Sequence, residues 1–280
     1  MDPWEPLGPG IGLRIGTEEL ASGPVAGRSV HAAGHLHGPP GYLQGGLCAG
    51  VLLGAARRLD PIAAPPTSVD VALHAPTPLG ERLGVVAHRY GAGEHQLELV
   101  HGDTTTVSGT VHLTGHELAS RAFDLMSLAT VGLPAPQRQE VFPLCWVCGP
   151  DNPDGLRLLP GWHAPGQFVV PWIPDTAFDD GRGAIDPVVV CAVLDCPTLW
   201  ANRHHLMSLE RPAALLAALH VRFFGDAPVH EPLRLVAIAD EPDGRKLRAR
   251  SALLDEDARV YATAAALWIA VTDLPARTVS

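Results

Sequence analysis

The stretch GYLQGGLCAGVLLGAARRL, residues 41–59, has an ungapped counterpart in GAIDPVVVCAVLDCPTLWA, residues 183–201, when Gln44 is aligned with Asp186. The central part of each stretch is apolar nearly all the way round a helix. A helix of that kind has to be buried on every side. The sequence therefore predicts two buried central helices, one in each half of the chain.

Runs typical of β-strands follow each predicted helix, and turn residues separate them. The runs after the first helix are SVDVALHAP, RLGVVAHRYG, HQLELVHG and TTVSGTVHLT, and those after the second are LAALHVRFFG, PLRLVAIAD, KLRARSALLD and RVYATAAALWIAV. In addition, the segment GLRI at residues 12–15 recurs as GLRL at residues 155–158. The order of strand, helix and antiparallel meander thus occurs twice. We expect an α+β fold in which a long antiparallel sheet wraps each central helix. A single mixed sheet of unrelated strands is the alternative.

This repeat divides the chain into two domains of ordinary size. We expect the first over residues 1–114 and the second over residues 142–280. Residues 115–141 would join them, with a helix in ASRAFDLMSLATVG and a proline-rich linker in LPAPQRQ.

Composition excludes several classes of protein. The 280 residues are 46% apolar and 18% charged, as in a globular protein. A formal net charge of -10 argues against nucleic acid as a partner, because binding to the phosphate backbone needs a basic surface. No apolar run reaches the ~18 residues of a membrane span. The start MDPWEPLGPG has no features of a secretory signal, and the five cysteines indicate reduced thiols, so we expect a cytoplasmic protein.

Three segments resemble one known family. CWVCGPDNPDGLRL, residues 145–158, is similar to the opening signature of hotdog-fold acyl-CoA thioesterases of the phenylacetate-pathway type. HGPPGYLQGG, from His37, resembles the start of the family's central helix, and SALLDEDARVYATAAALW, from Ser251, resembles its closing strands. The resemblance implies a tandem, or double, hotdog that hydrolyses an acyl thioester carried on coenzyme A or an acyl carrier protein. Coenzyme A would be part of the substrate, and no other cofactor is expected. Whether the chain forms a homo-oligomer is left open.

In this family a backbone N–H at the start of one central helix stabilises the oxyanion, and a carboxylate on the other helix acts as base or nucleophile. The family's helix-start glycine corresponds to Gly45, followed by Gly46, whereas the second half has Pro187, which lacks an N–H. The family's acid corresponds to Asp195, whereas the first half has Leu53.

These two losses are complementary. Nine residues of helix span about 13 Å, so the middle of one antiparallel helix lies near the start of the other. The resemblance therefore implies one composite catalytic site, made of Gly45, Gly46 and Asp195, and a second site that has become structural.

Four further residues are candidates for substrate binding. Tyr42 and Gln44 are placed to contact an acyl or pantetheine group. His37 would orient the substrate or assist proton transfer, unless it is an ordinary surface histidine. Thr198 would position a water molecule or satisfy a helix carbonyl.

The pair Cys145 and Cys148 has the spacing of a zinc ligand pair, but no second pair or histidines follow nearby. We therefore expect no metal site and treat these thiols as small packing residues. The sequence contains no G-x-S-x-G, Walker A or H-E-x-x-H motif. Two alternatives to hydrolysis remain, namely a non-hydrolytic acyl-CoA-binding or regulatory protein and an acyl-thioester hydratase or dehydratase.

Overall fold

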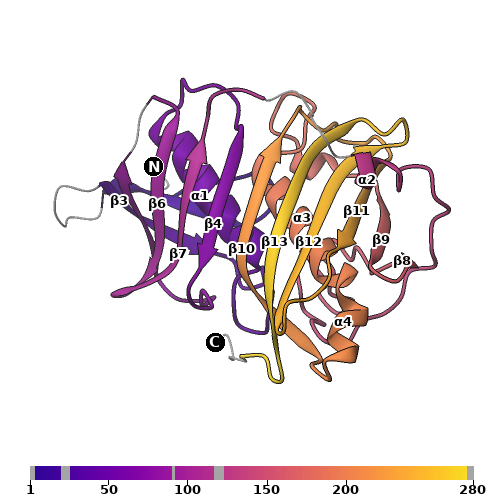
Figure 1. Cartoon of the computed structure of the whole chain (residues 1–280). Helices are drawn as coiled ribbons and strands as arrows, with labels where there is room; N and C mark the ends of the chain where they lie inside the picture. Colours follow the sequence, from indigo (N-terminus) through magenta and orange to yellow (C-terminus); the bar gives the residue numbers. More distant parts are fainter. Residues whose placement is uncertain (1–3, 20–25, 90–91, 117–122, 276–280) are drawn as a thin grey trace.

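A computed structural model describes residues 4–19, 26–89, 92–116 and 123–275. The strands of these residues form one antiparallel sheet of 13 strands (Figure 1). They are β1 (Trp4–Pro6), β2 (Leu13–Glu19), β3 (Ala26–Ala32), β4 (Ser68–Leu73), β5 (Leu83–Arg89), β6 (Glu94–His101), β7 (Thr104–His112), β8 (Trp162–Ala164), β9 (Gln167–Trp172), β10 (Ala213–Phe223), β11 (Leu233–Ala239), β12 (Lys246–Asp255) and β13 (Val260–Val271). The helices are α1 (Gly45–Leu59), α2 (Phe123–Met126), α3 (Pro187–Ala201) and α4 (Arg203–Ser208), with a short 3-10 turn over Thr176–Phe178.

The strand order shows the predicted repeat. From the centre outward, β4, β7, β6, β5, β3 and β2 in the first half correspond to β10, β13, β12, β11, β9 and β8 in the second. The halves join where β4 pairs with β10, with Val71 opposite Leu219. The repeated order excludes a sheet of unrelated strands, and the two halves share one continuous sheet.

Three details differ from the sequence-based expectation. The strand that follows each central helix does not pair with the next strand along the chain. Instead, β4 pairs with β7, and β10 pairs with β13. Of the two matching GLRI and GLRL segments, the first begins β2 but the second, at residues 155–158, is not a strand. The predicted linker helix is limited to α2 among the described residues, while residues 117–122 lie outside them.

The predicted domain bounds stay a prediction, although the segment after the linker contacts the first half. The Trp146 N–H donates to the His37 carbonyl at 2.7 Å, and the Asn152 side-chain amide donates to the His35 carbonyl at 2.7 Å. Residues that open the second half thus hold the loop that leads into α1.

Helices α1 and α3 lie side by side against the same face of the sheet (Figure 1). They run antiparallel, since Gly46 faces Cys191 and Ala192 while Gly50 faces Val188. A Cβ on Gly46 would lie 2.4 Å from the Cys191 carbonyl oxygen, so this close approach requires glycine. Residues 46–56 of α1 and all of α3 are buried, as the all-round apolar pattern predicts.

The two central helices begin differently. Gln44 caps α1, with its side-chain oxygen accepting from the Leu47 N–H. Asp186 caps α3, with Pro187 in the first turn where a missing N–H costs no hydrogen bond. The N-terminus of α1 therefore keeps a backbone donor that α3 lacks.

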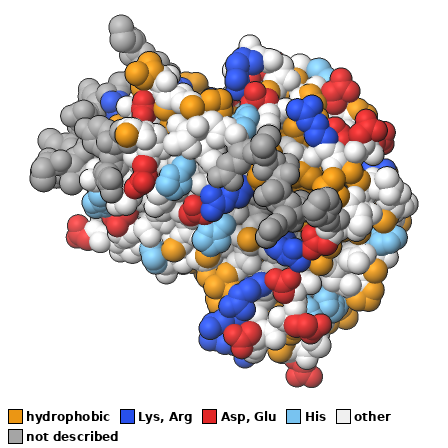
Figure 2. All heavy atoms as spheres, turned by 45° about the horizontal axis from the view of Figure 1, so that its top comes forward, with side chains coloured by type: hydrophobic (Ala, Val, Ile, Leu, Met, Phe, Trp, Pro, Cys, Tyr) orange, Lys and Arg blue, Asp and Glu red, His pale blue; other side chains and the backbone are white. Residues whose placement is uncertain are grey.

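On the face shown in Figure 2, the Lys and Arg side chains lie beside Asp and Glu side chains and do not gather into one basic area. This mixture fits the net negative charge of the chain. None of the helices in the described part of the chain has the length and apolar character of a membrane span.

Candidate active site

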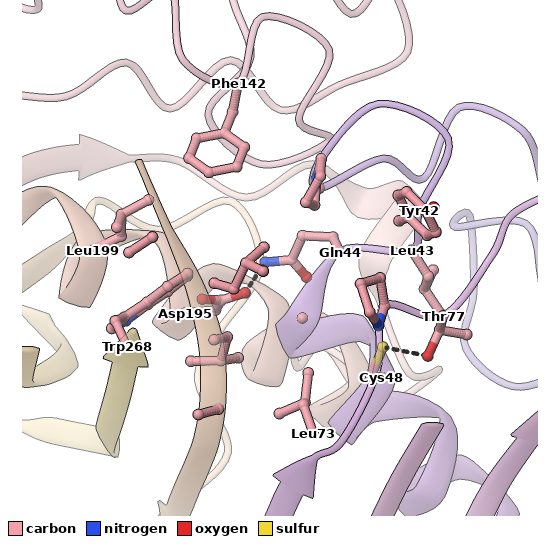
Figure 3. A pocket seen from close by; sticks show the side chains of 18 of the residues that line it. Tyr42, Leu43, Gln44, Cys48, Leu73, Thr77, Phe142, Asp195, Leu199 and Trp268 are labelled. Carbon is pink, nitrogen blue, oxygen red and sulfur yellow. Dashed lines mark hydrogen bonds between the residues drawn. The ribbon is translucent and has the colours of Figure 1, made fainter. Parts of the chain in front are cut away.

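A cavity of about 230 Å³ lies between the two halves, beside the start of α1 and the middle of α3 (Figure 3). Most of the side chains around it are apolar, and the described residues that line it include no Lys or Arg. Six of the lining residues are Tyr42, Leu43 and Leu73 from the first half and Phe142, Leu199 and Trp268 from the second. The cavity therefore suits an uncharged, largely apolar group.

Asp195 also lines this cavity, and the residue is 2% exposed. Its Oδ2 accepts from the Gln44 side-chain amide at 2.5 Å and from the Gly46 N–H at 2.8 Å. Its Oδ1 is buried and has no hydrogen-bond partner among the described residues. In Figure 3 the carboxyl group lies between Gln44 on one side and Leu199 and Trp268 on the other.

Burial raises the pKa of Asp195 to about 8, because a carboxylate loses its hydration in this apolar site. The hydrogen bonds from the Gly46 N–H and the Gln44 amide act in the opposite direction and lower the pKa. The result is a carboxyl group with one oxygen held in place and a basicity suited to proton transfer near neutral pH.

The first turn of α1 has three N–H groups, and two of them are occupied. The Leu47 N–H donates to the Gln44 side-chain oxygen at 2.7 Å, and the Gly46 N–H donates to Asp195. The Gly45 N–H has no partner among the described residues, and Gly45 lines the cavity. Gly46 was expected to face a substrate carbonyl together with Gly45, but its N–H orients the acid instead.

The four predicted substrate-binding residues separate into two groups. Tyr42 and Gln44 line the cavity. His37 and Thr198 are not among its lining residues. His37 is half-buried, its Nδ1 accepts from the Gly41 N–H at 3.1 Å, and burial lowers its pKa. His37 therefore shapes the turn before α1.

The Thr198 hydroxyl is occupied by the protein. It donates to the Asp195 carbonyl at 2.6 Å and accepts from the Trp268 indole N–H at 2.9 Å. Of the two uses that the sequence suggested, satisfying a helix carbonyl is the one that is present. Through this contact Thr198 also fixes Trp268, which lines the cavity.

The pseudosymmetric position at the start of α3 has a different arrangement. Asp186 takes the place of Gln44, and its Oδ2 forms an ion pair with Arg57 at 2.9 Å. Leu53, opposite Asp195 in the repeat, is fully buried, and Leu7 packs on the neighbouring Gly54. This position therefore combines a side-chain ion pair with apolar packing.

Sequence reasoning missed several residues of the cavity. Cys196 follows Asp195 directly, and its sulfur lies 3.7 Å from that of Cys145. Trp268 and Leu216 reach the cavity from β13 and β10. No local pattern identifies them, because only the pairing of the central strands brings them to this place.

No protein-family model matches the chain, and no curated protein matches it. Several solved structures are similar. An acyl-CoA thioesterase II, TesB2, from Mycobacterium marinum is 15% identical with a TM-score of 0.58, over 90% of this chain and 95% of that one.

Two further solved structures that are similar to this chain are not described as thioesterases. The dehydratase domain of RzxB from Pseudomonas fluorescens is 15% identical with a TM-score of 0.63, over 94% of this chain and 99% of that one. A conserved protein with a hot dog fold from Alicyclobacillus acidocaldarius is 14% identical with a TM-score of 0.55, over 89% of this chain and 94% of that one. Together with the repeated strand order and the paired central helices, these similarities show that the chain has the predicted double hotdog fold.

Proposed function

We propose that the protein hydrolyses an acyl thioester in the cavity between its two halves. The observation that carries the proposal is the Asp195 carboxyl group, whose Oδ2 is held by two donors while its Oδ1 has no partner among the described residues. Its position beside a largely apolar cavity and the unpartnered Gly45 N–H supports the combination of a base with an oxyanion donor.

In the proposed reaction the thioester carbonyl oxygen accepts a hydrogen bond from the Gly45 N–H. Asp195 Oδ1 takes a proton from a water molecule, whose oxygen attacks the carbonyl carbon. The tetrahedral intermediate then collapses with cleavage of the C–S bond, and the proton on Asp195 passes to the leaving thiolate. The products are a carboxylic acid and a free thiol, and Asp195 is regenerated as a carboxylate.

The cavity suits the acyl end of the substrate. Its volume of about 230 Å³ is below the roughly 300–1,000 Å³ of pockets that enclose drug-sized ligands, which favours a short acyl group. Because no Lys or Arg is among the described lining residues, the phosphates of coenzyme A or of a carrier protein's pantetheine would stay outside.

Incubation of the purified protein with a panel of acyl-CoA and acyl carrier protein thioesters tests the proposal. Thiol release would be followed with a thiol reagent, against a blank that accounts for the chain's five cysteines. Release that is lost in Asp195→Asn supports hydrolysis. Binding without turnover would instead identify an acyl-CoA-binding protein. A changed acyl group without thiol release would identify a hydratase or dehydratase.

A further inference from the structure

Three cysteine sulfurs form a compact group at the wall of the cavity. The sulfurs of Cys145, Cys148 and Cys196 lie within 4.8 Å of one another, and all three residues are buried. Cys145 and Cys148 belong to the loop that opens the second half, whereas Cys196 lies in the middle of α3, 51 residues beyond Cys145. The third partner that the sequence spacing lacked is therefore supplied by the fold.

The separation of two of these sulfurs matches a tetrahedral metal centre. Zinc–sulfur bonds of about 2.3 Å at tetrahedral angles place two sulfurs about 3.8 Å apart. The sulfurs of Cys145 and Cys196 are 3.7 Å apart.

Each of the three sulfurs has an N–H neighbour. The backbone N–H groups of Val147 and Cys148 lie near the Cys145 sulfur. The Trp200 indole N–H donates to the Cys148 sulfur at 3.2 Å, and the Gln44 amide lies 3.7 Å from the Cys196 sulfur. Donors of this kind stabilise thiolates and orient metal ligands.

The loop that carries the first two cysteines is rigidly shaped. The Gly149 N–H donates to the Cys145 carbonyl at 2.8 Å. A Cβ on Gly149 would lie 2.4 Å from that same carbonyl oxygen, so the turn tolerates only glycine there. This turn presents both sulfurs toward Cys196.

We propose that Cys145, Cys148 and Cys196 bind one zinc ion through three thiolates, with the fourth coordination position open to the cavity. Zinc suits three thiolate ligands, and sites with three protein ligands leave a position for water or another small ligand. All three cysteines line the cavity, and no fourth His, Cys, Asp or Glu belongs to the group within the described ranges. Binding releases the thiol protons to the buffer and involves no change of oxidation state.

The test measures metal binding directly and does not depend on turnover, so it is separate from the proposed hydrolysis. The full chain is reduced, stripped of metal with a chelator, and titrated with Zn²⁺ against a chromophoric competitor. Titration with Co²⁺ in parallel reports thiolate coordination through a charge-transfer absorption. We expect one equivalent of either metal and a thiolate band.

Matched variants make the test specific. Cys196→Ser and Cys145→Ser should each weaken Zn²⁺ binding by more than roughly 100-fold. This is a larger loss than removal of a group that only hydrogen-bonds to a metal ligand would cause. Cys48→Ser should bind as the unchanged chain does, because Cys48 also lines the cavity but lies outside the group, with its thiol directed to Thr77. Thermal unfolding of each metal-free variant identifies any that fail to fold, and Cys145→Ala and Cys196→Ala would then replace the serine variants.

Three results would overturn the proposal. The first is the absence of stoichiometric binding by the reduced chain. The second is equal binding by folded Cys196→Ser or Cys196→Ala. The third is a thiolate band that is lost in Cys48→Ser but kept in both cluster variants. A disulfide between Cys145 and Cys196 in untreated protein, with no metal bound after reduction, would show that the group is a dithiol pair instead.

Discussion

The Gln44 side-chain amide and Asp195 Oδ2 are 2.5 Å apart, although the two residues come from different halves of the chain. The same oxygen accepts from the Gly46 N–H, so the start of α1 fixes the carboxyl group on α3. Only Oδ1 is then left for a water molecule or a substrate. The proposed base is thus oriented by the half of the chain that does not contain it.

Replacing the acid is the most direct test of this arrangement. Asp195→Asn keeps the size of the side chain but removes the base, so kcat/KM for thioester hydrolysis should fall by about 100- to 10,000-fold. Steady-state thiol release measures the change. Asp70→Asn, on the outer face of the sheet, is the control and should retain activity. Equal rates for Asp195→Asn and the unchanged chain would exclude Asp195 as the base.

The stability of Asp195→Asn has a predictable pH dependence. Burial raises the pKa of Asp195 to about 8 in the folded chain, whereas an unfolded Asp titrates near 3.9. Between these values the unfolded state loses its proton first, so ionisation lowers the free energy of unfolding as pH rises from about 4 to about 8. The Asn variant lacks this decline. The free energy of unfolding of Asp195→Asn, minus that of the unchanged chain, should therefore increase with pH across that range. Denaturant unfolding of both proteins measures this difference.

The activity should follow the same ionisation in the opposite sense. Asp195 must be deprotonated to act as a base, so kcat/KM should rise with pH toward about 8 and level off above it. Well below that value, kcat/KM should fall about tenfold for each unit by which the pH is lowered. The profile is measured from pH 6 to 10 in a chelating buffer that keeps metal from the thiols. A profile that is flat down to pH 6 would contradict a base with this pKa.

A pair of substitutions at Gly45 isolates its N–H group. Gly45→Ala keeps the N–H and adds a Cβ that would lie 2.6 Å from the end of Leu216, a side chain that can shift. Gly45→Pro adds similar bulk but removes the N–H, and the extended backbone of Gln44 is compatible with a following proline. We expect kcat/KM of the Pro variant to fall about 100- to 1,000-fold below that of the Ala variant. Equal rates for the two variants would exclude this N–H as the oxyanion donor.

Gln44 is expected to act by positioning Asp195. Its hydrogen bond lowers the pKa of that carboxyl, so Gln44→Leu should move the rise in kcat/KM to higher pH. The same change removes the cap of α1, at a cost of about 0.5–2 kcal/mol in the free energy of unfolding. The pH profile separates the two effects, because loss of a cap alone would leave its midpoint in place.

The contact between the central helices predicts a stability effect. Gly46→Ala would place a Cβ 2.4 Å from the Cys191 carbonyl oxygen and 2.8 Å from Ala192 Cα. The helices would have to separate, so the free energy of unfolding should fall by about 1–3 kcal/mol. Gly132→Ala is the control, because a Cβ there meets open space. Denaturant unfolding of both variants decides whether the close approach is essential.

Much of the fold could be predicted from the sequence because the repeat is strong there. The all-round apolar character of α1 and α3 correctly predicted two buried helices, and the alternating runs gave the main strands. The pairing of β4 with β7 could not be predicted, because hydrophobic alternation does not specify a strand's neighbour. The residues of the short strand β8 were likewise not anticipated, since the repeated GLRL segment lies in a loop instead.

The candidate site was predictable only in outline. The family resemblance, together with offset counting along antiparallel helices, suggested that Asp195 and Gly45 lie near each other. The use of the Gly46 N–H by Asp195 was not predictable, because it depends on how closely the helices approach. The meeting of Cys196 with Cys145 and Cys148 was also missed, since it depends on where the loop after the linker returns to α3.

The ion pair between Arg57 and Asp186 stands where a symmetric pair of identical subunits would repeat the proposed catalytic position. In such a pair, a proline at the helix start or a leucine in place of the acid would alter both positions at once. Joining the two copies covalently removes that constraint, because each substitution affects a single location. One location is then free to become structural, while its counterpart keeps the groups of the proposed reaction.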